Sequence, residues 1–157
     1  MKKLAAALVV CLIAGAVSVQ AGPQTVISDA KNIRYLFTMA AKSGTSAGDT
    51  LTLKGVPLVV YFADRPYRVA GHMNLESFLQ LWDKGVDNFK DNPPNAQLAI
   101  YEESGDKHAV LIISKQAVNG DAISFKVDII DETLPGSFGH ATLFIDGLGI
   151  IFPSGQN

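Results

Sequence analysis

The side chains best suited to chemistry are densest in one short loop, between Asp64 and His72. Within nine residues this loop holds the carboxylate of Asp64, the guanidinium groups of Arg65 and Arg68, and the imidazole of His72. Two arginines at the end of a rigid strand can hold a carboxylate, phosphate or sulfate between them, and a histidine adds a pH-sensitive donor. The loop is therefore a candidate ligand-binding site, with Asn95 of the later PPNA segment as a further member.

The same loop also has a structural interpretation. A loop that leaves a buried strand must satisfy its backbone polar groups, and each guanidinium offers several donors. Arg65 and Arg68 could therefore bond Asp64, the last carbonyls of a helix, or the backbone of residues 92–96. The ligand site and the structural brace both stay open, and the brace is the commoner role for such arginines.

The usual catalytic motifs are missing from the sequence. It has no nucleophile elbow, no phosphate-binding glycine loop and no pair of zinc ligands on a helix. His72, His108 and His140 lie far apart in the sequence, and the single cysteine is Cys11. We therefore predict no catalytic residue, no metal and no cofactor. A metal site built in space from two of the histidines and Asp64 is the open alternative.

The first 21 residues have the pattern of a secretory signal peptide. Lys2 and Lys3 provide the positive start, residues 4–17 are apolar, and residues 19–21 fit a cleavage site. We expect residues 1–21 to be removed and residues 22–157 to form a single β-rich domain in the periplasm or outside the cell. An uncleaved membrane anchor is the alternative.

Removal of this segment changes both the charge and the cysteine content. The formal net charge goes from −2 to −4, because 13 − 2 = 11 basic residues remain against 15 acidic ones. A mildly acidic exterior argues against nucleic acid as a partner, and no cluster of basic residues indicates anionic lipid. Without cysteine the domain must be stabilised by its core. The partners left are a small anion or an envelope protein, with no stable membrane anchor after cleavage.

Alternating apolar residues predict short β-strands along the rest of the chain. These patterns cover residues 33–39, 49–54, 97–102, 108–114, 123–129 and 141–145. The uninterrupted apolar run Leu58–Ala63 predicts a strand buried on both faces, and the charged loop follows directly after it. Residues 42–48 are expected to form a loop, and Asn119-Gly120 a turn within a loop longer than a two-residue hairpin.

One helix is expected directly after the charged loop. Asn74 is a suitable N-cap, apolar residues recur at helical spacing from Leu75 to Trp82, and Gly85 fits the position that ends a helix. The aromatic stripe should pack in the core. Seven strands and one helix predict a mainly β fold, an antiparallel β-sandwich (immunoglobulin-like or similar) with one short helix between strands.

Three segments carry a resemblance to other proteins: YFADRPYRVAGHMN (61–74), NPPNAQL (92–98) and ATLFID (141–146). Together they resemble a group of small exported bacterial proteins for which no activity is established. The likeness extends over residues 51–146, and its most specific part is the aromatic-x-DRP-x-R element. It implies export and a β-rich domain, and it assigns no catalytic residue.

Two functions of different classes fit this sequence. The first is an exported, non-enzymatic module that binds a small anion or an envelope partner through the Asp64–His72 loop. The second is a small periplasmic enzyme, a hydrolase or lyase, with His72 or Asp64 as base and with Arg65 and Arg68 holding an anionic substrate.

Overall fold

The computed structural model describes residues 33–63, 65–85 and 87–149. Ten strands of these residues form one open antiparallel sheet, in the order β5-β4-β1-β10-β6-β7-β8-β3-β2-β9. The strands are β1 (Arg34–Ala41), β2 (Ser43–Ala47), β3 (Thr50–Lys54), β4 (Val59–Ala63), β5 (Ala70–Met73), β6 (Asn95–Ile100), β7 (Lys107–Asn119), β8 (Ala122–Asp131), β9 (Ser137–Phe138) and β10 (Ala141–Gly149). The one helix of the described residues is α1 (Leu75–Leu81).

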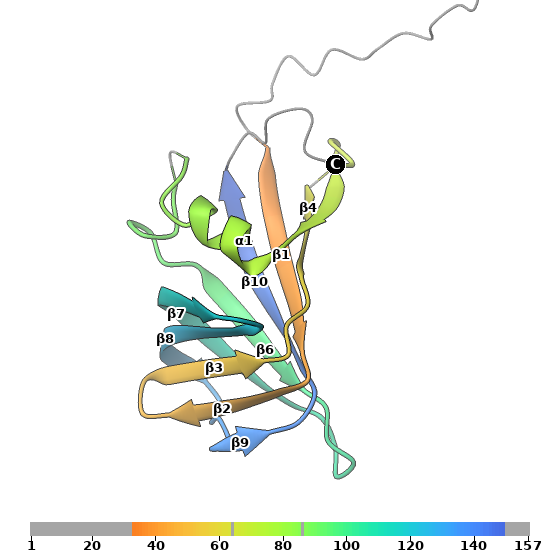
Figure 1. Cartoon of the computed structure of the whole chain (residues 1–157), viewed down its shortest axis with the longest axis vertical. Coiled ribbons are helices and arrows are strands. Elements are labelled where there is room, and N and C mark those ends of the chain that lie inside the picture. Colours follow the sequence, from red (N-terminus) through yellow and green to blue (C-terminus); the bar gives the residue numbers. More distant parts are fainter. Residues whose placement is uncertain (1–32, 64, 86, 150–157) are drawn as a thin grey trace, which may run out of the picture.

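The sheet curls, so that distant strands face one core. Figure 1 shows β1 and β10 running along the long axis of the molecule, whereas β2 and β3 run across it. Phe37 of β1, Leu53 of β3 and Leu143 of β10 are almost fully buried in the same apolar cluster. The prediction of a mainly β, antiparallel fold with one short helix is confirmed. The sandwich arrangement stays a prediction, because the ten strands belong to one open sheet.

The helix α1 begins where the sequence predicts. The side-chain oxygen of Asn74 accepts a hydrogen bond from the backbone N–H of Ser77 at 2.8 Å, which satisfies one of the free donors of the first turn. The predicted end at Gly85 is wrong, because the helix ends at Leu81 with Trp82 as its C-cap. The N–H groups of Trp82 and Lys84 bond to carbonyls three residues earlier, so the last turn tightens before Gly85 is reached.

The aromatic face of α1 packs in the core, as predicted. Phe78 and Trp82 are buried, at 0% and 4% exposure. The ring of Phe78 lies 5.3 Å from that of Phe37, and the ring of Trp82 lies 5.1 Å from Phe89 and 5.9 Å from Phe125, measured between centroids. These contacts fix the helix against the concave side of the sheet.

Residues 42–48 do not form the predicted loop, because most of them form β2. Their small residues have little strand propensity, and pairing with β3 and β9 decides the conformation instead. Gly44 is needed there, since a Cβ at this position would meet the ring of Phe138 and the carbonyl of Thr52. This edge of the sheet is thus specified by tertiary packing.

The strand that precedes the charged loop is not buried on both faces. In β4, Val60 and Phe62 are 37% and 40% exposed, whereas Val59 is fully buried. One face of β4 packs on the core and the other faces solvent, the alternation that the central strands β1 and β8 also show in this sheet. The charged loop itself is shorter than predicted, because β5 pairs with β4 and turns residues 59–73 into a hairpin.

The turn at Asn119-Gly120 is tighter than expected. Asn119 of β7 pairs with Ala122 of β8, so Gly120 and Asp121 form a two-residue hairpin turn. The φ of Gly120 is 62°, the left-handed conformation that such a turn requires and that glycine adopts at no steric cost. The tight turn lets β7 and β8 run as the longest pair of strands in the sheet.

In the part of the chain that the structure describes, no helix has the length and apolarity to cross a bilayer. The predicted signal peptide, residues 1–21, lies outside the described residues.

Candidate functional site

The predicted site residues lie in two places. Arg65 and Arg68 lie in the turn between β4 and β5, His72 lies in β5, and all three are exposed at the edge of the sheet. Asp64 lies outside the described residues. Asn95 begins β6, and β1 and β10 separate that strand from β4. The fold therefore gathers the two arginines and the histidine on one hairpin and places Asn95 elsewhere.

Asn95 lies beside a small polar hollow of about 110 Å³. Arg34 of β1 lines the same hollow, donates to the carbonyl of Gly147 at 3.2 Å, and lies 4.0 Å from the carboxylate of Asp87. Asn92 donates to the other oxygen of Asp87 at 2.9 Å. Sequence reasoning missed Arg34 because it stands alone in a strand pattern. The hollow is a junction that joins the 87–95 loop to the end of the sheet.

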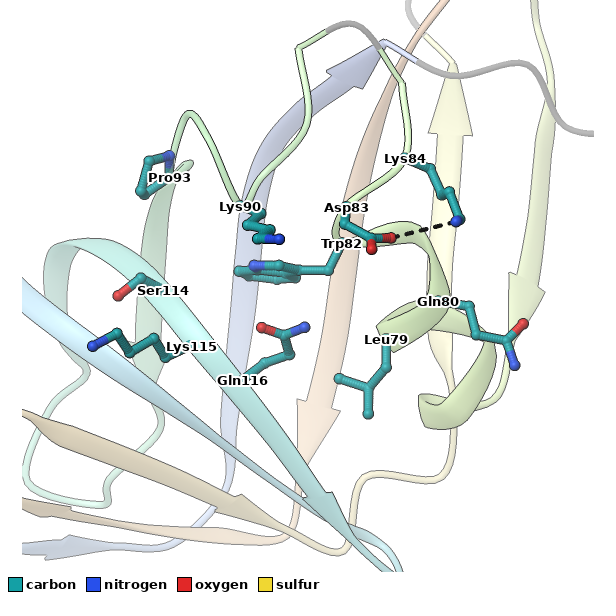
Figure 2. Close-up of a pocket in the computed structure, with 10 residues that line it drawn as sticks. All are labelled: Leu79, Gln80, Trp82, Asp83, Lys84, Lys90, Pro93, Ser114, Lys115 and Gln116. Carbon is teal, nitrogen blue, oxygen red and sulfur yellow. Dashed lines mark ion pairs between the residues drawn. The ribbon is translucent and has the colours of Figure 1, made fainter.

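A much larger cleft lies between α1, the loop after it, and β7 (Figure 2). Its volume is about 960 Å³. Small-molecule sites typically measure roughly 300–1,000 Å³, so the cleft has the size of a ligand site. Its lining residues are Leu79, Gln80, Trp82, Asp83, Lys84, Lys90, Pro93, Ser114, Lys115 and Gln116. None of the predicted site residues is among them.

The cleft carries a surplus of positive charge. The charged residues that line it are three lysines (Lys84, Lys90 and Lys115) and one carboxylate, that of Asp83. The formal charge of the lining is therefore 3 − 1 = +2, whereas the formal net charge of the whole chain is −2. Lys84 lies 3.6 Å from Asp83, but both side chains are more than half exposed, so this pair is weak. With the described residues, Lys90 and Lys115 form no ion pair. Their ammonium groups are available to an anion.

Trp82 gives the cleft a rigid aromatic base. Its ring is held by Phe89 and Phe125 behind it, and its backbone carbonyl accepts a hydrogen bond from the N–H of Lys90 at 3.1 Å. That bond keeps Lys90 close to the indole. In the view of Figure 2, the side chains of Lys90 and Gln116 lie on opposite sides of the ring. The aromatic core thus positions at least one of the three lysines.

The β7 wall of the cleft is irregular. Ser114 pairs with Lys126 and Ala117 pairs with Ser124, so two residues of β7, Lys115 and Gln116, face only one residue of β8. This two-against-one count defines a β-bulge. The backbone of Lys115 has φ 44°, in the left-handed region that residues with a Cβ seldom adopt.

Three shifted pKa values stand out among the described residues, and none belongs to the cleft. Burial raises the pKa of Tyr35, with a smaller contribution from Tyr61. Hydrogen bonds from lysines lower the carboxyl pKa of Asp49 (from Lys126) and of Glu102 (from Lys107). No three His, Cys, Asp or Glu side chains within the described ranges are grouped to hold a metal ion. The cleft itself offers ammonium and amide donors beside apolar surface.

No protein-family model, no curated protein and no solved structure matches this chain. Its function therefore has to be inferred from its own residues and their geometry.

Proposed function

We propose that this protein is an exported, non-enzymatic binding module that holds an acidic small molecule in the cleft between α1 and β7. The observation that supports this most is the surplus of lysines on one concave surface of an otherwise acidic chain. Ammonium groups attract carboxylate and phosphate oxygens, and a concave low-dielectric wall strengthens that attraction. Because the three lysines are exposed, added salt should weaken the binding of such an anion.

The cleft also has apolar surface to offer. Leu79, Trp82 and Pro93 line it together with the lysines. Ligand sites in proteins commonly combine an apolar lining with a few placed polar groups, the first for affinity and the second for orientation. The proposed ligand is therefore an amphipathic anion, with one acidic group and an apolar body.

Export is part of the proposal and rests on the sequence. Residues 1–21 have the charged, apolar and small-residue regions of a signal peptide, and residues 51–146 resemble small exported bacterial proteins. A periplasmic or secreted module would meet amphipathic anions from the envelope or the medium.

The hairpin of β4 and β5 is the second candidate for an anion site, and the place where the enzyme alternative would act. Arg65, Arg68 and His72 are exposed there on a sheet edge. We favour the cleft because it combines three lysines with apolar surface in one concavity, whereas the hairpin presents its charged groups on an exposed turn.

The fluorescence of Trp82 provides the test, since it is the only tryptophan of the chain and lines the cleft. We expect octanoate and octyl phosphate to change this fluorescence in a saturable way, and octyltrimethylammonium, with the same tail and the opposite charge, to do so much more weakly. The Lys90→Gln variant should bind octanoate several-fold less tightly, whereas Lys54→Gln, an exposed lysine at the end of β3 outside the cleft, should bind like the parent.

Two results would overturn the proposal. One is the absence of saturable binding of any octyl anion. The other is equal binding of the anionic and cationic probes, because the ammonium groups of the lysines would then contribute nothing to the affinity for the ligand.

A further inference from the structure

The bulge in β7 explains how three consecutive residues come to line one cleft. In a regular strand, neighbouring side chains point to opposite faces of the sheet, so only alternate residues can share a wall. Ser114, Lys115 and Gln116 all line the cleft. They do so because Lys115 and Gln116 together occupy the place opposite Phe125. The irregularity therefore adds a side chain to the cleft wall.

This arrangement has a cost in backbone strain. Lys115 has φ 44°, and a residue with a Cβ is destabilised in the left-handed region relative to glycine or asparagine. Two other described residues with a Cβ share this conformation, Arg68 (φ 50°) in the turn between β4 and β5 and Glu132 (φ 65°) after β8, but of the three only Lys115 lines the cleft. Strained residues that persist in a fold are concentrated at binding and active sites.

We infer that Lys115 is the residue that selects the acidic group of the ligand, which rests on the proposed function of the cleft. Its side chain and that of Ser114 lie at one end of the cleft, Leu79 and Gln80 lie at the other, and the indole of Trp82 extends between them (Figure 2). The acidic group binds at the bulge, at the Lys115 end of the cleft, with the Lys115 ammonium as its counter-ion. The apolar body extends along the cleft toward Leu79, past the small exposed part of Trp82.

Charge and strain at Lys115 can be separated by substitution. Lys115→Asn removes the charge and places a residue that tolerates the left-handed backbone, while Lys115→Arg keeps the charge and the strain. Glu132 is a matched control, because it also has a left-handed backbone, with φ 65°, and lies outside the cleft. Glu132→Asn relieves strain without changing the lining of the cleft.

The experiment measures melting temperature and octanoate affinity for each variant, the affinity through the fluorescence of Trp82. For Lys115→Asn we expect a melting temperature at or above that of the parent, affinity for octanoate about tenfold lower, and loss of the preference for octanoate over octyltrimethylammonium. Lys115→Arg should retain the preference. Glu132→Asn should bind octanoate like the parent.

The outcomes separate this inference from the proposed function. If the parent and Lys90→Gln differ in octanoate affinity but Lys115→Asn binds like the parent with its preference intact, the cleft is an anion site and the role of Lys115 is wrong. If the parent itself binds no octyl anion, the proposed function fails, and the role of Lys115 fails with it.

Discussion

Asp49, just before β3, shows how single side chains tie distant strands together. Its carboxylate accepts a hydrogen bond from Lys126 of β8 and forms an ion pair with it. This contact lowers the pKa of Asp49. A carboxyl whose pKa is lower in the folded state than its unfolded value of about 3.9 stabilises the fold above that value. This contribution is lost as the pH falls through the folded pKa. Since Asp49 is largely exposed, the effect should be small.

We therefore expect Asp49→Asn to lower the melting temperature near neutral pH and to leave it unchanged at a pH well below the folded pKa of Asp49. Thermal unfolding of parent and variant across an acid-to-neutral pH series is the measurement. A difference that is the same at both ends of the series would show that the carboxylate charge plays no part.

At the scale of elements, α1 connects the fold to the cleft, because Leu79 and the C-cap residue Trp82 both line it. Asn74→Ala removes the side-chain cap of the first turn and should lower the free energy of unfolding by about 1 kcal/mol. Asn74→Asp, which keeps a capping oxygen, should stay close to the parent. Chemical denaturation measures both. Equal stability of the alanine and aspartate variants would contradict a role for this cap.

The hairpin of β4 and β5 depends on a close approach of backbone and ring. A Cβ on Gly71 would stand 2.5 Å from the hydroxyl oxygen of Tyr61. Gly71→Ala should therefore destabilise the protein by roughly 1–3 kcal/mol, the usual cost of overpacking. Gly139→Ala is the control, because no atom lies within 4 Å of the Cβ it would add. If both variants unfold alike, the ring contact does not constrain the hairpin.

The same elements show what a sequence can predict. Strands with clean alternation, such as that of residues 123–129, and the N-cap of α1 follow from local rules, and the structure contains both. The strands β2, β5 and β9 were missed because their residues have no alternating apolar pattern and become strands only by pairing with neighbouring strands. The run at 58–63 was misjudged because apolar residues, Val60 and Phe62, also occupy the face of β4 that is exposed to solvent.

At the scale of the whole molecule, curvature of the sheet creates the site. Lys84, Lys90 and Lys115 are scattered along the sequence, and only the packing of α1 against β7 brings them around one cleft. No sequence pattern marks these lysines, whereas the density of charged residues around Arg65 and Arg68 led to the prediction of a ligand site in that loop. The bulge at Lys115 is likewise invisible in sequence, since nothing in the residue types predicts a left-handed lysine.

The location of the site is the central claim, and mapping of backbone amide chemical shifts during an octanoate titration tests it most directly. We expect shifts concentrated at the end of α1, around Lys90, and at Ser114–Gln116 of β7, with the hairpin from Arg65 to His72 unaffected. Shifts centred on that hairpin, or no saturable shifts at all, would contradict the assignment of the cleft as the binding site.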